Sequence, residues 1–255
     1  MAKKHSRAVA KRSPQLPHSD DDGNRIQNEI LLSLPPEECD IIFPQLEFVR
    51  LSFLQVLHEV GDSIKSAYFC NTGMISTLKV FPDGKTVEVG LLGNEGFVGL
   101  PLVVGFRSSS LRVNVQIEGS AFRIGADGLL QGLPRCPQLA RGLNQFSQIM
   151  GMQVAQIAAC NRLHEVEERL ARWLLMCADR AGNQRLPLTQ DLLAQMLGTR
   201  RASVTLAAGV LQKAGFIDYR RGEVEILDRR KLEETSCECY DIIQQQIAKW
   251  RSEAS

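Results

Sequence analysis

The feature that most constrains this chain is a set of residues at fixed offsets within residues 188–217. Thr189 has a side chain that caps helix starts, and Ala194 is small where two crossing helices must approach closely. Gly198 follows four residues later, where a tight turn needs a positive φ, and Val204 gives the next helix an inward-facing apolar group. Each position alone is weak evidence. Together, in this order, they predict a helix-turn-helix.

The second helix of this motif and the hairpin after it carry the residues expected to contact double-stranded DNA. The helix should begin near Arg200, and arginine at such an end can bond bidentately to guanine in the major groove. The strands around Arg220 and Arg221 predict a wing that reaches the phosphate backbone. Residues 180–231 hold ten Lys and Arg against five Asp and Glu, whereas the whole chain has a net charge of +1. The expected DNA-binding residues are Thr189, Thr199, Arg200, Arg201, Ser203, Thr205, Arg220 and Arg221.

The first half of the chain has a different periodicity. Residues 48–124 contain short apolar runs interrupted by Gly, Pro, Asp and Asn, a pattern that predicts an antiparallel β-roll. Within it, Pro82-Asp83-Gly84-Lys85 predicts a hairpin turn, because Gly84 can supply a positive φ. The runs expected to form separate strands include 67–69, 74–81, 111–117 and 121–124.

A long helix is predicted after Pro137, because apolar side chains recur at spacings of four and three as far as His164. A helix of this length would extend about 40 Å. Its apolar stripe either packs on the chain's own barrel or forms the seam of a parallel coiled-coil dimer. We favour the dimer, because another face with Ile149 and Val154 is left for the barrel. The expected dimer interface consists of Leu143, Phe146, Met150 and Ile157.

These segments define an α+β fold with an N-terminal antiparallel β-roll, a long dimerisation helix and a C-terminal winged helix-turn-helix. Residues 1–23 are expected to be a disordered tail, and residues 24–136 a sensor domain. Residues 137–164 form the dimerisation helix, and residues 165–255 the DNA-binding domain with a C-terminal helix.

The seven cysteines set limits on the chemistry of the chain. An odd number of scattered cysteines without an export signal favours reduced thiols and a cytoplasmic protein. Cys237 and Cys239 form at best half of a metal site, so a structural role on a terminal helix is preferred, and neither a metal nor a cofactor is expected. The common nucleophile, phosphate-loop and zinc-protease motifs are missing, which argues against an enzyme. No apolar run is long enough for a membrane span.

The architecture from about Arg25 to Lys231 resembles the CRP/FNR family of bacterial transcription regulators, most specifically over residues 160–231. The stretch Leu92-Gly-Asn-Glu-Gly-Phe-Val-Gly99 looks like the entrance to the phosphate-binding cassette of that family. Members that bind cyclic AMP place a glutamate where this chain has Leu100, and an arginine where it has Ser108-Ser109-Ser110. Cyclic nucleotides are therefore not the expected effector. The resemblance implies an effector pocket at Phe97, Gly99, Leu100, Arg107, Ser109, Ser110 and Arg112.

The resemblance also implies a homodimer that reads a two-fold symmetric operator, under the control of an effector whose identity the sequence does not give. It adds RNA polymerase as a further partner. A haem bound by His58 or Cys70 stays an alternative, although a lone histidine in a strand is more often structural. The rival interpretation of the whole chain is a ligand receptor that signals through protein contacts without binding DNA.

Overall fold

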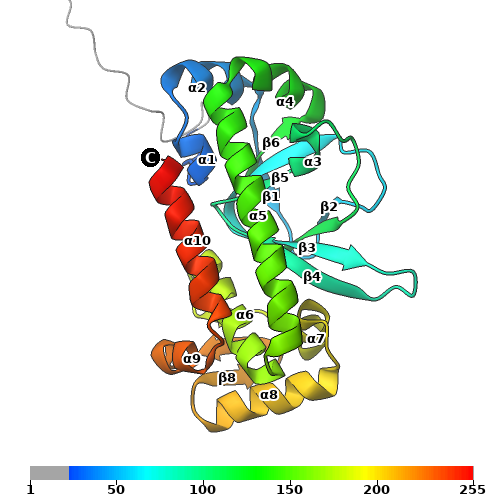
Figure 1. The fold of residues 1–255 in the computed structure, drawn as a ribbon, viewed down its shortest axis with the longest axis vertical. Coiled ribbons are helices and arrows are strands. Elements are labelled where there is room, and N and C mark those ends of the chain that lie inside the picture. The colour runs from blue at the N-terminus through cyan, green and yellow to red at the C-terminus, as the bar shows by residue number, and fades with distance from the viewer. Residues whose placement is uncertain (1–22, 255) are drawn as a thin grey trace, which may run out of the picture.

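The computed structural model describes residues 23–254 and shows an α+β chain with a β-roll at one end and a smaller domain at the other (Figure 1). The disordered tail expected over residues 1–23 lies outside the described residues, apart from Gly23. Two short helices and a 3-10 turn lead into the roll: α1 (Glu29–Leu32), α2 (Pro36–Ile42) and η1 (Phe43–Gln45).

The β-roll is built around two long antiparallel strands, β3 and β6, with β1 and β4 on either side of them. The short strands β2 and β5 pair with β6 and β3. The strands are β1 (Glu47–Leu51), β2 (Val56–His58), β3 (Ser66–Val80), β4 (Thr86–Leu92), β5 (Phe97–Val98) and β6 (Arg112–Gly125).

The strand runs at 67–69 and 74–81 belong to the single strand β3, and those at 111–117 and 121–124 to β6, so the expected breaks are wrong. The interruptions are irregularities in the pairing of β3 with β6, where the register shifts. Two glycines permit a close approach there. A Cβ on Gly73 would lie 2.5 Å from the Ile117 carbonyl oxygen, and one on Gly119 would lie 2.0 Å from that of Thr72. The polar and glycine residues bend these strands without ending them.

Three further elements connect the roll to the long helix α5: α3 (Leu100–Val103), α4 (Ala126–Gly132) and η2 (Leu133–Arg135). α5 (Pro137–Leu163) begins where the sequence predicts, with proline in its first turn. Its N-terminus is capped by a distant side chain, since the buried Glu38 carboxylate accepts from the backbone N–H groups of Gln138 (2.8 Å) and Leu139 (2.9 Å). A carboxylate at this position also complements the helix dipole. The sequence alone does not reveal this cap, because Glu38 lies a hundred residues upstream.

The apolar stripe of α5 is covered by the chain itself. Leu143, Phe146, Met150 and Ile157 are exposed by only 0, 1, 9 and 6%. One edge of the stripe faces the roll, and the other packs against α10 (Cys239–Ala254), where the rings of Phe146 and Trp250 lie 6.3 Å apart. The dimer seam assigned to these four side chains is therefore wrong, because they are buried within one chain, Met150 beside the roll and Phe146 beneath α10.

The C-terminal domain follows His164, the extended residue that ends α5. Two acidic side chains form a capping box at the start of its first helix, α6. β7, β9 and β8 form a small antiparallel sheet in that order. The elements are α6 (Val166–Ala181), β7 (Arg185–Leu186), α7 (Gln190–Leu197), α8 (Arg201–Lys213), β8 (Ile217–Arg220), β9 (Glu223–Ile226), α9 (Arg229–Thr235) and α10.

α6 is joined to the β-roll by buried polar contacts. Glu88 of β4 accepts hydrogen bonds from the Trp173 indole N–H (2.7 Å) and the Ser76 hydroxyl (2.6 Å). Arg180 pairs with Glu95 at 2.8 Å, and both side chains are almost completely buried. A single hydrophobic core runs through the roll and the C-terminal domain. The two domains therefore pack as one body in this conformation.

Within residues 23–254, none of the helices combines the length and the apolar character that crossing a bilayer requires.

The buried carboxyl group of Glu88 should make the free energy of unfolding depend on pH. Burial raises the pKa of Glu88 from 4.5 to about 7, so the folded chain holds this proton more tightly than the unfolded chain. The associated stabilisation is complete below the unfolded pKa and is lost as pH rises through the folded pKa, a change of about 3 kcal/mol. Glu88→Gln can keep both hydrogen bonds and does not titrate. The free energy of unfolding, measured with urea, should therefore fall more between pH 5 and pH 8 for the wild type than for Glu88→Gln. Equal decreases in the two proteins would contradict the assignment.

Candidate nucleic-acid interface and effector pocket

The helix-turn-helix consists of α7 and α8, as the spacing of small and apolar residues predicts. Thr189 is the N-cap of α7, and its hydroxyl accepts from the Leu192 N–H at 3.2 Å. Gly198 takes a φ of 59°, and a Cβ at this position would lie 2.5 Å from Val87 of the roll. The turn therefore requires glycine both for its conformation and for space. Val204 is fully buried on the inner face of α8.

Three of the predicted DNA contacts lie exposed at the start of α8: Arg200, Arg201 and Thr205. Arg201 lies 3.4 Å from Asp191 across two well-exposed side chains, a pair that contributes little and that a DNA phosphate or base can replace. The Thr205 hydroxyl donates to Gln190 (2.9 Å) or to the Arg201 carbonyl (3.0 Å). This end of the helix is therefore polar, cationic and open.

Thr199 and Ser203 are placed differently from the prediction. Both are half-buried and line a groove between the start of α8 and the β3–β4 hairpin, with Arg200 at its edge. Gln195 of α7 donates a hydrogen bond to Thr86 of that hairpin. In this conformation, DNA contact through Thr199 and Ser203 requires the hairpin to move. The hairpin lies more than a hundred residues upstream, so local spacing cannot reveal the contact.

The wing is the β8–β9 hairpin, and Arg220 and Glu223 face each other across the two strands next to the turn. Its two turn residues, Arg221 and Gly222, have φ values of 52° and 81°, the pattern of a type I′ turn. Left-handed backbone costs a residue with a Cβ roughly 1–2 kcal/mol, and asparagine or glycine is the usual choice. Arg220 forms an ion pair with Asp218 at 2.9 Å, whereas Arg221 lines an open cleft together with Thr189 and Arg201.

α8 also exposes apolar side chains that the sequence-based set omits. Leu206 is 74% exposed and Val210 49%, one helical turn apart. Ala202 lies one turn before Leu206 on the same exposed face. Apolar side chains at such positions can pack against thymine methyl groups. Once Val204 is fixed as buried, the helical period places these residues outward, so that period is the signal that could have identified them.

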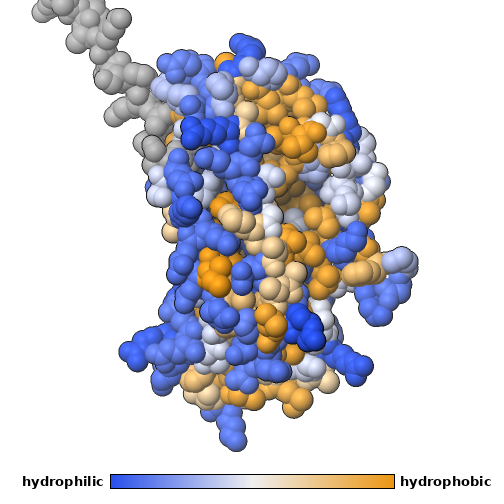
Figure 2. Space-filling view, viewed as in Figure 1, coloured by the Kyte–Doolittle hydropathy of each residue, from blue (hydrophilic) through white to orange (hydrophobic). Residues whose placement is uncertain are grey.

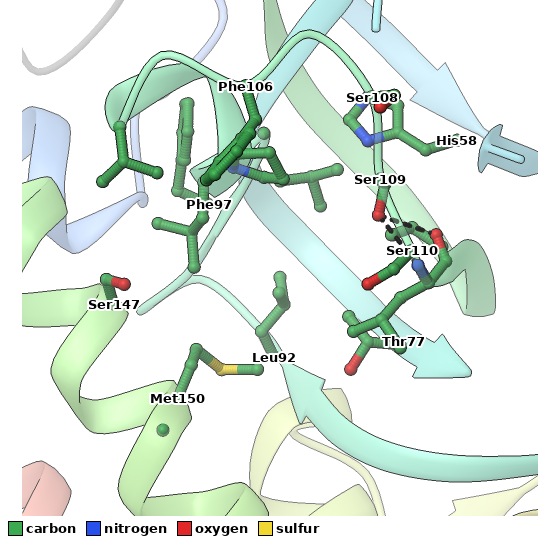
Figure 3. A pocket seen from close by; sticks show the side chains of 18 of the residues that line it. His58, Thr77, Leu92, Phe97, Phe106, Ser108, Ser109, Ser110, Ser147 and Met150 are labelled. Carbon is green, nitrogen blue, oxygen red and sulfur yellow. Dashed lines mark hydrogen bonds between the residues drawn. The ribbon is translucent and has the colours of Figure 1, made fainter. Parts of the chain in front are cut away.

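A cavity of about 600 Å³ lies between the β-roll and α5 (Figure 3). Five predicted effector residues line it: Phe97, Gly99, Leu100, Ser109 and Ser110. The rings of Phe97 and Phe106 lie on one side, and Ser147 and Met150 come from α5 on another. In Figure 2 the corresponding hollow beside α5 is surrounded by apolar residues. The remaining lining residues are His58, Thr77, Leu92, Val98, Pro101, Val104, Ser108, Leu111, Val113, Gly151 and Val154.

Arg107 and Arg112 do not line this cavity, so their assignment to the pocket is wrong. Arg107 pairs with Asp127 at 2.8 Å, and Arg112 with Glu59 at 2.9 Å. Among the lining residues of the described chain, none carries a carboxylate, an ammonium or a guanidinium group. His58 is the one titratable side chain in that lining, and burial lowers its pKa, which keeps the imidazole neutral near pH 7. The cavity is therefore neutral and mostly apolar.

The haem alternative finds little support in the geometry. The His58 ring already bonds the Ser66 carbonyl through Nε2, at 2.8 Å. Cys70 is fully buried and lies outside the residues that line the cavity.

A further group of residues converges outside both sites, at the end of α5 and the start of α10. Cys237 and Cys239, which the sequence presents as half of a metal site at best, lie beside Cys160 and His164. The four ligand atoms lie within 4.8 Å of one another. The signal was present as a four-residue spacing from Cys160 to His164 together with a C-x-C pair, but nothing local joins the two halves.

Comparison with known proteins agrees with this architecture. Residues 168–235 match the model of the Crp-like helix-turn-helix domain. A crp/fnr-family regulator structure from Eubacterium rectale is 17% identical, with a TM-score of 0.65, over 79% of this chain and 94% of that chain. FixK2 from Bradyrhizobium japonicum is 17% identical, with a TM-score of 0.64, over 75% of this chain and 98% of that one. The c-di-GMP-responsive regulator CLP from Xanthomonas campestris is 16% identical, with a TM-score of 0.63, over 74% of this chain and 97% of that chain.

No curated protein matches the chain in sequence. The similarity to these structures establishes the fold, and the matched domain establishes the helix-turn-helix.

The wing supplies a test that separates charge from backbone strain. Arg221→Asn should relieve the left-handed strain and keep or raise the melting temperature. It should nevertheless weaken binding to a random-sequence duplex and reduce the slope of log affinity against log salt by about 1. Arg221→Lys, which keeps the charge and the strain, is the matched control. Unchanged affinity and slope for Arg221→Asn, measured by fluorescence anisotropy, would remove the wing from the interface.

Proposed function

We infer that this chain, a DNA-binding regulator of the CRP/FNR type with a Crp-like helix-turn-helix domain, works as a homodimer on a two-fold symmetric operator. Residues 24–136 are the sensor, residues 137–164 the dimer helix and residues 165–255 the reading domain. The observation that carries this proposal is the open cationic start of α8 beside a wing with Arg221 at its tip. Half-sites one helical turn apart, roughly 34 Å, fit a two-fold dimer. RNA polymerase is the further protein partner, and the cytoplasm is the place of action.

The roles at the DNA follow from the chemistry of each side chain. Arg200 and Arg201 offer bidentate donors to guanine, and Thr205 a hydroxyl to phosphate or base. Leu206 provides an apolar surface for a thymine methyl group. Arg221 holds the backbone at the wing, with Arg220 and Thr189 beside it. Thr199 and Ser203 join the interface only after the hairpin leaves the groove.

The exposed face of α5 is the surface we assign to the dimer. Its centre consists of the small residues Gly151, Ala155 and Ala158. Their spacings of four and three place them on one face of the helix. Figure 2 shows this strip running between the polar surface of α10 and the apolar hollow. Val154 and Leu163 are exposed beside it, by 38 and 74%. Small side chains allow two helices to approach closely along their length, so the strip suits a second copy of the same helix.

This assignment predicts that Ala158→Glu yields monomers. Across a two-fold axis each Ala158 lies near its counterpart, so the substitution places two carboxylates together in a closing interface. Ala158 is exposed in one chain, so folding should change by less than about 0.5 kcal/mol. Sedimentation velocity measures the outcome, with Ala158→Ser as the control of similar size. A dimeric Ala158→Glu protein would exclude this face.

The effector we propose is a small, uncharged and largely apolar molecule. The cavity offers aromatic and aliphatic side chains with a few hydroxyl groups, and its lining has no cation to neutralise a phosphate. The β3–β4 hairpin connects the cavity with the reading domain, because Thr77 and Leu92 line the cavity while Val87 contacts the turn at Gly198. An occupant that displaces this hairpin would open the groove at Thr199 and Ser203.

The ligand prediction separates neutral from anionic molecules. Calorimetry with cyclic AMP and cyclic GMP at sub-millimolar concentration should show no binding, because a buried phosphate would lack a counter-charge. The uncharged fluorophore N-phenyl-1-naphthylamine should bind, and Phe106→Ala at the cavity should weaken its binding. Phe53→Ala, another partly exposed phenylalanine on the roll that does not line the cavity, is the control. Tight binding of either cyclic nucleotide would overturn the proposed ligand class.

A further inference from the structure

A compact group of three thiols and one imidazole lies at the hinge between the two domains. Cys160 is in the last turn of α5, and His164 is in the extended link to α6. Cys237 lies between α9 and α10, and Cys239 is the first residue of α10, so both follow the helix-turn-helix and the wing in the sequence. The Sγ atoms of Cys160 and Cys237 lie 3.5 Å apart, as do Cys239 Sγ and His164 Nδ1.

We propose that Cys160, His164, Cys237 and Cys239 bind one zinc ion in a tetrahedral Cys₃His site. In a tetrahedral site with Zn–S bonds of 2.3 Å, neighbouring ligand atoms are about 3.8 Å apart. The pairs Cys160–Cys237 and Cys239–His164, each at 3.5 Å, are within a few tenths of an ångström of that value, and all four atoms lie within 4.8 Å. Three soft thiolates with an imidazole favour zinc over the hard cations. Four protein ligands complete the coordination, so the site is structural.

The surroundings of the group match what a zinc site needs beyond its ligands. Glu238 places a carboxylate oxygen 3.2 Å from His164 Nε2, which orients the ring with Nδ1 toward the sulfurs. A carboxylate on the second nitrogen is the usual partner of a metal-bound histidine. Gln156 donates an amide N–H to Cys239 Sγ at 3.0 Å. The three cysteines are exposed by no more than 4%, so water is kept from the sulfurs.

Charge balance at the site is also favourable. Three thiolates and one zinc ion carry a net charge of −1, which a buried site must compensate. Arg169 and Arg172 of α6 are buried, and the Nε atom of each has no hydrogen-bond partner within the described chain. Both guanidinium groups lie within electrostatic reach of Cys160. Two buried cations beside a cluster of thiols suit an anionic metal centre.

A disulfide explains fewer of these features. A bond between Cys160 and Cys237 requires their sulfurs to move from 3.5 Å to about 2.05 Å, and it gives no role to His164, Cys239 or Glu238. The metal accounts for all four side chains and for their outer partners.

The site would close the reading domain at its base. Cys160 and Cys237 are 77 residues apart, and the helix-turn-helix and the wing lie between them. A metal that joins these positions removes the conformational freedom of a long loop and fixes the hinge at His164. Zinc removal should therefore loosen the attachment of the reading domain, with a lower melting temperature for the full chain.

The test uses the full-length protein, purified under reducing conditions without chelator. Elemental analysis should give one zinc per chain for the wild type and none for the double variant Cys237→Ser, Cys239→Ser. Cys39→Ser, a buried cysteine outside the group, is the matched control and should keep its zinc. Replacement by Co²⁺ should produce the visible bands of a tetrahedral thiolate complex in the wild type only.

A milder variant keeps the proposal testable if the double variant fails to fold. Glu238 is largely exposed, so Glu238→Gln should fold normally. It should lower zinc affinity by about 10- to 100-fold in competition with a chromophoric chelator, because it removes the partner of the histidine. Unchanged affinity would overturn the role of Glu238. A wild-type protein without metal, a protein that holds iron, or a Cys160–Cys237 disulfide found by mass spectrometry of fresh protein would each overturn the zinc site.

Discussion

The contact between α6 and the β-roll determines how this molecule is organised. Trp173 and Arg180 reach from the C-terminal domain to Glu88 and Glu95 of the β-roll, and both carboxylates are buried. Removing one partner of the Arg180–Glu95 pair leaves a buried charge unpaired, at a cost of about 3–5 kcal/mol. The two domains are therefore held in one orientation by more than the α5–α6 link. Any movement of the C-terminal domain away from the roll has to offset this contact.

The same region connects the two functional surfaces. β4 carries Glu88 in its middle, Leu92 at the cavity and Val87 against the helix-turn-helix. α5 crosses β4 as well, where Gln153 bonds both the N–H and the carbonyl of Leu91 at 3.1 Å. One strand thus contacts the cavity, the long helix and the reading domain. Close-packed elements of this kind change position together more easily than they deform.

The elements that can be predicted from the sequence are those whose determining interactions are local. Gly198 and Val204 define the helix-turn-helix because each position has its own steric requirement within one short segment. The start of α5 and the hairpin at Gly84 are local in the same sense. The cover of Phe146 by α10, the groove at Ser203 and the convergence of Cys160 with Cys237 depend on residues 77 or more apart, which no periodicity specifies.

The last helix changes the mechanics of the hinge. α10 starts beside the cysteines at the base of the reading domain, runs back along α5 and ends where Arg251 pairs with Glu29 at 2.7 Å. A domain joined to its neighbour by one flexible link can rotate in any direction. This domain has a second, rigid connection, which acts as a brace parallel to the first. A displacement of the domain that moves the start of α10 must therefore shift α10 along α5 or break the contact of Trp250 with Phe146.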